Sequence, residues 1–406
     1  MKNKVILSVV WFTAAFVITG CQRPQAKQYN RQLPPGELAL RKITNPDEIP
    51  DFTYGCYNAA NVPRAINNSL NYLAKPSSKQ FFPYGEITHQ HAVESLKAFK
   101  KLIDSGLRGP QLNDAIYQQF DVYTSVGCDD KGTVLFTGYY TPIFDGSPVA
   151  TEQFKYPLYN QPNDLVKDSM GQILGRRMPD GKIKPYPPRA EIETSDMLKG
   201  NELTWLADPF EVYIAHVQGS AKIRLPDDKL VTTGYAANNG YEYHSISEEL
   251  VNEGKIKAEQ LSLSAMIDFF RKNINLVSEY TRRNPRFVFF RQLDGPPRGS
   301  INEPVTTLRT LATDKSIYPR ACLAFFSTTL PREIGGNIYH DPYEGFALDQ
   351  DTGGAIRAPG RCDVYMGEGD TAGKLAGQIY QEGRLYYLFL KQAYAESIPP
   401  ALPGKQ

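Results

Sequence analysis

The sequence predicts a mainly β protein with flanking helices, in which the two chain ends build one unit and the middle of the chain forms an inserted β unit. The composition supports this, because 30 Pro, 32 Gly and 25 Tyr in 406 residues are typical of short strands joined by turns. Apolar residues at helical spacing occur before and after a long β-favouring stretch. Two units joined in this way leave a groove, a common place for a functional site.

The first twenty residues predict a lipoprotein signal peptide. A basic start is followed by an apolar run over residues 5–18, which is short for a membrane span. A glycine then precedes Cys21, as in a bacterial lipobox, so we expect Cys21 to be acylated and to anchor the chain to a membrane. Gln22 favours the outer membrane, by resemblance to Gram-negative lipoproteins. Residues 21–50 are rich in Gln, Arg and Pro and predict a tether.

Two helices are predicted after the tether. Residues 88–105 carry apolar side chains at steps of three and four, and Gly106 is a suitable C-terminal cap. Leu112, Ile116 and Phe120 repeat this spacing and indicate a second helix.

From Gly132 to about Gly240 the chain favours β structure, with frequent Pro and Gly. In the last part of this stretch we predict strands over Val212–Gln218, Ala221–Leu225 and Leu230–Tyr235, the last two joined by a tight turn. The inserted unit is predicted to span residues 135–240.

Helical spacing returns over residues 264–273, and short strands separated by Gly and Pro follow. They are predicted at Phe287–Arg291, Ala321–Ser327, Asp363–Met366 and Leu385–Leu390. Residues 51–134 and 241–400 are therefore assigned to the unit built from both chain ends.

The net charge and the absence of certain sequence motifs argue against nucleic-acid binding, metal-dependent hydrolysis, serine hydrolysis and nucleotide binding. The net charge is +1, which gives no global field to attract nucleic acid. The five His form no HExxH pair, and neither a GxSxG elbow, a phosphate-binding loop nor a dinucleotide fingerprint is present. The cysteines after Cys21 lack zinc-site spacing, and their disulfide pairing does not follow from the sequence; Cys322 is predicted to lie in the core. We expect no metal or other cofactor.

An acidic, glycine-rich stretch near the C-terminus is the strongest candidate site. It holds seven carboxylates and two arginines, Arg357 and Arg361, and Asp363 begins a half-buried strand. Carboxylates held close together cannot all ionise freely, so one is expected to keep its proton and act as a general acid. A solvated or Ca²⁺-binding loop is the alternative. The carboxylates are Asp341, Glu344, Asp349, Asp351, Asp363, Glu368 and Asp370.

Asp351-Thr352-Gly353 is also the triplet of aspartic proteases. Such enzymes need two facing loops, and the other candidate, Asp104-Ser105-Gly106, ends the helix predicted over 88–105. A homodimeric aspartic protease is therefore a remote alternative.

Several ordered motifs resemble the membrane-bound lytic transglycosylase A family and its C-terminal domain named for three aspartates. The resemblance covers roughly residues 50 to 395, and the chain departs from the pattern at Thr141, Ala221 and Ala358. The motifs are Phe136-Thr137-Gly138-Tyr139-Tyr140, Gln218-Gly219-Ser220, Asn239-Gly240-x-x-Tyr243, Phe287 to Arg291, Asp351 to Ile356, Asp363, and Gly367-x-Gly369-Asp370.

The resemblance implies a double-psi β-barrel built from both chain ends, a smaller inserted β-barrel, and glycan bound between them. It implies that Asp363 is the acid/base catalyst and that Asp351 and Asp370 are the other two named aspartates. The implied enzyme is a peptidoglycan lytic exotransglycosylase, although the residues themselves do not distinguish exo from endo action. The expected partners are peptidoglycan glycan strands, outer-membrane lipid through Cys21, and a cell-wall enzyme complex of unknown composition.

Substrate contacts are expected from the other motifs. One of Tyr139 and Tyr140 is expected to stack on a sugar and the other to face the core. Gln218 and Ser220 are expected to bind sugar groups, with a hairpin turn at Gly219 as the alternative. The remaining expected substrate-binding residues are Thr137, Gly138, Gly353, Gly354 and Arg309, the last having an ion pair with Asp314 as its alternative.

Two other functions stay open. The protein is either the transglycosylase, a non-catalytic peptidoglycan-binding lipoprotein, or a muramidase that uses water as the nucleophile.

Overall fold

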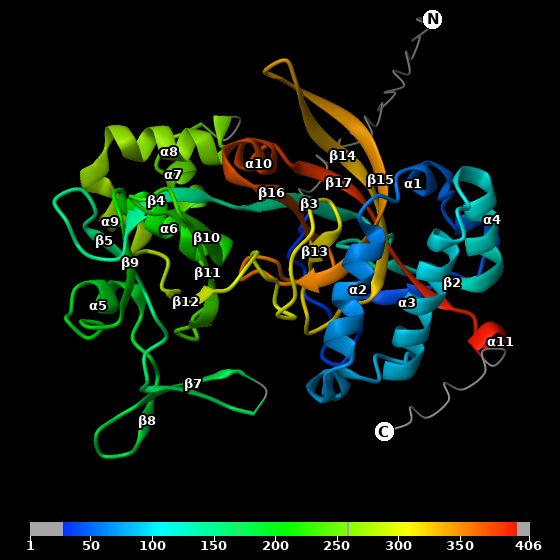
Figure 1. Ribbon diagram of the computed structural model, residues 1–406, viewed down its shortest axis with the longest axis horizontal. Helices are drawn as coiled ribbons and strands as arrows, with labels where there is room; N and C mark the ends of the chain where they lie inside the picture. Colours follow the sequence, from blue (N-terminus) through cyan, green and yellow to red (C-terminus); the bar gives the residue numbers. More distant parts are fainter. Residues whose placement is uncertain (1–26, 170, 258–259, 396–406) are drawn as a thin grey trace, which may run out of the picture.

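A closed barrel of six strands forms one lobe of the molecule (Figure 1). The computed structural model describes residues 27–169, 171–257 and 260–395. The barrel order is β17-β14-β15-β13-β16-β3, and pairing of β3 with β17 closes it. Its strands are β3 (Val134–Thr141), β13 (Thr310–Ala312), β14 (Leu323–Ile334), β15 (Asn337–Asp351), β16 (Arg361–Glu368) and β17 (Tyr380–Leu390). The predicted barrel from two distant parts of the chain is confirmed.

Helices cover the outer side of this barrel. The prediction over residues 88–105 is confirmed by α3 (His89–Asp104), where Thr88 caps the N-terminus and Gly106, at φ 85°, follows the C-terminus. Its apolar face packs with side chains of β14 and β15 in one core cluster. The other elements of this lobe are β1 (Leu40–Lys42), η1 (Pro46–Glu48), α1 (Thr53–Tyr57), α2 (Val62–Leu73), η2 (Pro76–Phe81), α4 (Gly109–Gln119), β2 (Phe120–Ser125), α10 (Gly369–Ala376) and α11 (Gln392–Ala395).

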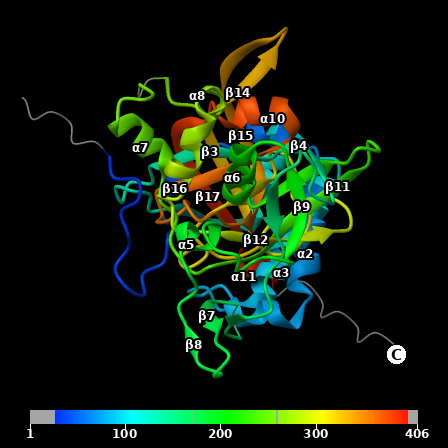
Figure 2. The same ribbon diagram turned by 90° about the vertical axis from the view of Figure 1, so that its left-hand side faces the viewer.

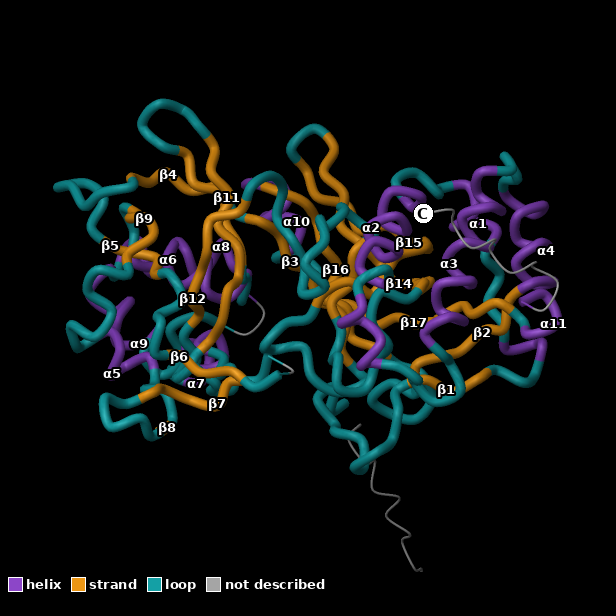
Figure 3. The backbone as a smooth tube through the Cα atoms, turned by 60° about the horizontal axis from the view of Figure 1, so that its bottom comes forward, coloured by secondary structure: helices purple, strands orange, loops and turns teal. Residues whose placement is uncertain are grey.

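The second lobe contains a six-stranded sheet of order β12-β11-β10-β4-β9-β5. A bridge between Asn160 and Phe290 brings its two edges together, so the sheet curls toward a barrel. Figure 3 shows the two lobes side by side. The strands are β4 (Ile143–Ser147), β5 (Tyr156–Tyr159), β9 (Glu202–Leu206), β10 (Ser220–Arg224), β11 (Leu230–Asn238) and β12 (Val288–Leu293).

Short helices and a small sheet complete the second lobe. The β7–β8 hairpin projects from it, as both Figure 1 and Figure 2 show. The small sheet is β6 (Leu165–Lys167), β7 (Ile173–Arg177) and β8 (Ile183–Lys184), and the helices are α5 (Arg189–Glu193), α6 (Pro209–Gln218), α7 (Ile246–Asn252), α8 (Leu263–Lys272), η4 (Ile274–Leu276) and α9 (Val277–Thr281).

The prediction of a strand over Val212–Gln218 is wrong, because these residues belong to α6. The Asp208 carboxylate accepts a hydrogen bond of 2.7 Å from the Phe210 N–H, and Pro209 occupies the first turn. This start signal favours a helix over the β preference of the apolar run. The predicted hairpin that follows is confirmed by the antiparallel pair β10 and β11.

The predicted tether differs from the structure in its second half. β1 pairs with β2, and Ala39 is fully buried against the barrel. Three residues are too few to show a β period in the sequence.

β12 lies beyond residue 240 but pairs with β11 in the second lobe. The predicted boundaries of the inserted unit, at residues 135 and 240, stay predictions.

The anchor prediction at Cys21 lies outside the described residues. Within the described ranges, no helix combines the length and apolar character needed to cross a membrane. Cys56, Cys128, Cys322 and Cys362 are buried free thiols, and Cys322 lies in the core as predicted.

Candidate active site

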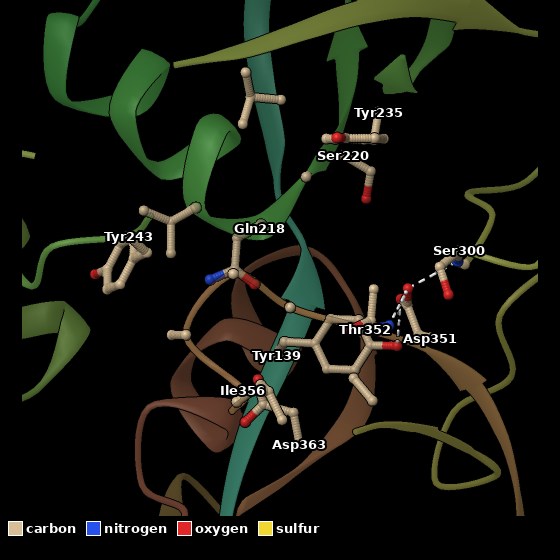
Figure 4. Close-up of a pocket in the computed structure, with 18 of the residues that line it drawn as sticks. Tyr139, Gln218, Ser220, Tyr235, Tyr243, Ser300, Asp351, Thr352, Ile356 and Asp363 are labelled. Carbon is tan, nitrogen blue, oxygen red and sulfur yellow. Dashed lines mark hydrogen bonds between the residues drawn. The ribbon is translucent and has the colours of Figure 1, made fainter. Parts of the chain in front are cut away.

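A cavity of about 1060 Å³ lies between the two lobes. The barrel contributes Asp351 and Asp363 to its lining, and the second lobe contributes Gln218, Ser220 and Tyr235. Figure 4 shows these two sets of side chains on opposite walls. The predicted groove between the units is therefore present, and it contains two of the three predicted aspartates.

Asp363 lies on β16, opposite Thr137 of the parallel neighbour β3. The Thr137 hydroxyl donates a hydrogen bond to one Asp363 carboxylate oxygen. Burial raises the pKa of Asp363 above its ordinary value of 3.8, while the Arg361 guanidinium and the Thr137 hydroxyl act in the opposite direction. Among the described residues, Asp363 therefore has one hydrogen-bond donor and one nearby cation in support of its negative charge.

Asp351, at the end of β15, has more hydrogen-bond donors. The backbone N–H groups of Ser300 and Thr352 lie 2.8 Å from its Oδ1, and the Tyr139 hydroxyl lies 2.8 Å from its Oδ2. Burial raises the pKa of Asp351 to about 6, and these donors oppose the rise. Asp351 is consequently mostly ionised at neutral pH.

The two carboxyls thus differ in chemical character. Three donors reach Asp351, whereas one described donor reaches Asp363, so the Asp363 carboxyl has the freer oxygen for proton exchange with a substrate, although the pKa rise to about 6 belongs to Asp351. No group of three or more His, Cys, Asp or Glu side chains in the described part of the chain is placed to hold a metal ion. The site is suited to proton transfer by a side chain.

The adjacent tyrosines of β3 point in different directions. Tyr139 lines the cavity, and its ring centroid lies 5.2 Å from that of Tyr365. Tyr140 is buried, and its ring packs so closely on Gly373 that a Cβ there would lie 2.7 Å from it. Alternation along the strand therefore leaves Tyr139 as the ring available to a sugar.

The Gln-Gly-Ser motif joins α6 to β10. Gly219 is the C-terminal cap of α6 with φ 74°, so the alternative of a hairpin turn at this position is wrong. Gln218 Oε1 accepts a hydrogen bond of 3.1 Å from the Tyr140 N–H, which links the second lobe to barrel strand β3. Gln218, Gly219 and Ser220 all line the cavity.

Comparisons with known proteins agree with this architecture. Residues 135–291 match the model of the MltA specific insert domain, and residues 309–389 match that of the 3D domain. Membrane-bound lytic murein transglycosylase A of Vibrio cholerae is 29% identical over all of this chain and 99% of that protein. The Escherichia coli K12 protein of that name is 30% identical over 276 residues, which are 66% of this chain and 69% of that protein. The chain belongs to the membrane-bound lytic murein transglycosylase A family.

Solved structures of the MltA family share the fold. A membrane-bound lytic murein transglycosylase from Agrobacterium tumefaciens superposes with a TM-score of 0.72 at 22% identity, covering 89% of this chain and 100% of that one. E. coli MltA with bound chitohexaose superposes with a TM-score of 0.65 at 25% identity, covering 89% of this chain and 96% of that one.

Two expected site residues lie elsewhere. Asp370, in the first turn of α10, lines a separate cavity of about 340 Å³. Arg309 is buried and donates hydrogen bonds to Asn58, Ala60, Tyr343 and Phe346, without the ion pair to Asp314. Arg309 holds the barrel to the segment after α1, and the expectation that it binds substrate is wrong for this arrangement.

The remaining expected residues line the main cavity. Gly353 and Gly354 lie in the loop after Asp351, and Gly138 lies on β3 beside Thr137. No described hydrogen bond joins the N–H groups of Gly353 or Gly354 to Asp363, so they do not orient the acid in this structure.

Sequence reasoning missed several residues of the cavity. Ser300 supplies a backbone donor that no side-chain pattern reveals. Lys315 lines the cavity and forms a buried ion pair with Asp349, whose carboxylate also accepts hydrogen bonds of 2.8 Å from Thr313 and 2.7 Å from Tyr387. Asp349, one of the seven clustered carboxylates, therefore has a structural role.

Proposed function

We propose that this protein is a peptidoglycan lytic transglycosylase in which Asp363 is the catalytic acid and then the base. The observation that carries this proposal is the unequal support of the two cleft carboxyls, one half-buried with a single donor and one with three. Relatives named lytic murein transglycosylase A, and the chitohexaose complex of one of them, support the substrate class.

The first step breaks the bond between N-acetylmuramic acid and N-acetylglucosamine. Protonated Asp363 gives its proton to the bridging oxygen, the C1–O bond breaks with its electron pair going to that oxygen, and the N-acetylglucosamine leaves with a free 4-hydroxyl. Positive charge develops at the muramoyl C1. Ionised Asp351 stabilises this charge from the same cleft.

The second step closes a ring within the muramoyl residue. Its C6 hydroxyl oxygen attacks C1, and the Asp363 carboxylate accepts the hydroxyl proton, which restores the acid. The product has a 1,6-anhydromuramoyl end, and no water is consumed. One carboxyl that changes protonation state is therefore sufficient, in contrast to the two that ordinary glycosidases use.

Water-consuming hydrolysis is the second candidate. It needs a carboxylate free to act as base or nucleophile. The Asp351 oxygens already accept three hydrogen bonds, which leaves them less available to a water molecule and favours the transglycosylase.

Mass spectrometry of a purified cell-wall digest tests the proposal. Anhydro ends support the transglycosylase, hydrated reducing ends indicate a hydrolase, and binding without release indicates a binding protein. Asp363→Asn is expected to abolish release and keep glycan binding. Asp341→Asn, which removes a carboxylate in the exposed part of the β14–β15 hairpin, is the matched control with normal release. Full activity of Asp363→Asn overturns the assignment.

The proposal includes the location and mode of action. Relatives are named membrane-bound, and Cys21 follows a lipobox-like run, so we propose an acylated Cys21 in the outer membrane. Cys21→Ala is expected to move the protein from the membrane to the soluble fraction. Exo action predicts that glycan strands labelled at one end release the label before any cleavage occurs in the interior of the strand.

A further inference from the structure

The cleft concentrates positive charge. Eight arginine and lysine residues line it, against two carboxylates, Asp351 and Asp363, among the described residues of the lining, whereas the whole chain has a net charge of +1. Three of these cations have a carboxylate partner within 4.0 Å. The others have none in the described part of the chain: Arg286, Arg291, Arg298, Arg320 and Arg361.

The cleft also contains hydrogen-bond donors that have no described acceptor. Four buried side-chain polar atoms of the described residues lack a hydrogen-bond partner, and three of them belong to cavity-lining residues: Arg320 Nε, Arg361 Nε and His216 Nε2. His216 Nδ1 accepts from the Arg189 guanidinium at 3.1 Å and the Val288 N–H at 3.2 Å, so its proton is on Nε2. All three unpartnered atoms are donors, which a ligand rich in acceptors would satisfy.

Two of the arginines without a described carboxylate partner lie beside the segment that joins Asp351 to Asp363. Arg286, from the second lobe, packs over Gly354, where a Cβ would lie 3.1 Å from its Nε, and donates a hydrogen bond of 2.9 Å to the Tyr241 carbonyl. Arg361 precedes Asp363 by two positions on β16, so both side chains lie on the same face. Its guanidinium is 3.4 Å from the Thr137 hydroxyl that binds Asp363.

We propose that Arg286 and Arg361 form a carboxylate receptor beside the reacting bond, which binds the acidic substituent that muramic acid carries and N-acetylglucosamine lacks. The inference rests on the proposed function. The carboxylate is either the free lactyl acid of a strand without peptides or an acid of the attached peptide. A guanidinium pairs with either one through charge-assisted hydrogen bonds. The receptor thereby selects cell-wall strands over neutral chitin.

Binding to the inactive Asp363→Asn protein tests the receptor by calorimetry. The ligands are peptide-bearing strands, peptide-free strands with free lactyl acids, peptide-free strands with those acids converted to methylamides, and chitohexaose. The acidic strands are expected to bind about tenfold more tightly than the methylamides, with an affinity that falls as salt rises. Preference for peptide-free acids identifies the lactyl group, and preference for peptide-bearing strands alone identifies the peptide.

Variants assign the effect to the two arginines. Arg286→Gln and Arg361→Gln are each expected to weaken binding of acidic strands about tenfold and to leave chitohexaose within about twofold. Arg332→Gln, on the exposed hairpin, removes the same charge outside the cavity and is expected to change neither. Lysine replacements are expected to restore part of the preference.

Two results overturn the inference. One is equal affinity of the methylamide strands and both kinds of acidic strand, and the other is an equal loss of acidic-strand and chitohexaose binding in glutamine variants with normal thermal unfolding. Anhydro products from the wild-type enzyme would leave the proposed function standing in that case. Absence of anhydro products refutes the proposed function without altering the binding comparison.

Discussion

Removal of the Tyr139 hydroxyl is expected to shift the acid limb of the pH–rate profile upward. In Tyr139→Phe, the ring remains, but Asp351 loses the donor that lies 2.8 Å from its Oδ2. This donor lowers the pKa of Asp351, so its loss raises a pKa that is already about 6. The proposed mechanism requires ionised Asp351, so we expect activity to increase as pH rises through this value.

The size of the shift follows from the hydrogen bond. A hydrogen bond to a charged group contributes roughly 1.5 to 3 kcal/mol, and one pKa unit corresponds to about 1.4 kcal/mol. Cleft water replaces part of the lost donor, so we expect a shift of about one unit, to about 7. At pH 6 the ionised fraction of Asp351 then falls from about a half to about a tenth, and kcat/KM falls about fivefold. At pH 8 the same effect is below about 1.2-fold.

The assay is the initial rate of anhydromuropeptide release from purified cell wall between pH 4.5 and 8.5. Tyr235→Phe removes a hydroxyl from the same cavity that has no described contact with Asp351, and its acid limb is expected to stay near pH 6. An acid limb of Tyr139→Phe that stays in place or moves downward would refute the assignment of Asp351 as the ionised partner.

Three further predictions concern charge, packing and hydrogen bonding. Arg361→Gln removes the cation that lowers the pKa of Asp363, so the alkaline limb of the profile is expected to move to higher pH, and an unchanged limb contradicts this. Arg309→Met leaves several buried acceptors unsatisfied, so the free energy of unfolding, measured in urea, is expected to fall by about 3 to 5 kcal/mol while KM stays unchanged. A raised KM with normal stability would instead indicate that Arg309 binds substrate. Gly138→Ala places a Cβ 2.8 Å from the Ala376 backbone and is expected to cost about 1 to 3 kcal/mol by thermal unfolding, so an unchanged melting temperature contradicts the packing shown.

The sequence predicts local structure well where one signal dominates. The helix over 88–105 has both a regular apolar face and suitable residues at each end, and it forms as α3. Val212–Gln218 has conflicting signals, since β-branched residues follow an Asp-Pro helix start, and the capping residues prevail. Single-residue preferences do not settle such a conflict.

The sequence predicts which types of residue form the site, but it does not predict the distances between them. Asp363 and Arg361 share a strand face, which the period of two alone indicates. In contrast, Arg286 precedes β12 of the second lobe, and only the packing of the two lobes brings it to Gly354, in the segment after Asp351. Ser300 contributes a backbone N–H, which no side-chain pattern reveals. The motif predicts Arg309 as a substrate ligand, and only the tertiary packing reveals that its donors face carbonyl groups inside the fold.

The pairing of β17 with β2, β14 and β3 has a consequence for how the enzyme matures. Until residues 380–390 are available, β3 and β14 keep open edges, and the barrel that contains β16 and Asp363 cannot close. A nascent chain that lacks residues 380–390 therefore carries Asp351 and Asp363 without the closed barrel that positions them. We expect cell-wall cleavage only after β17 has paired with β3 and β14.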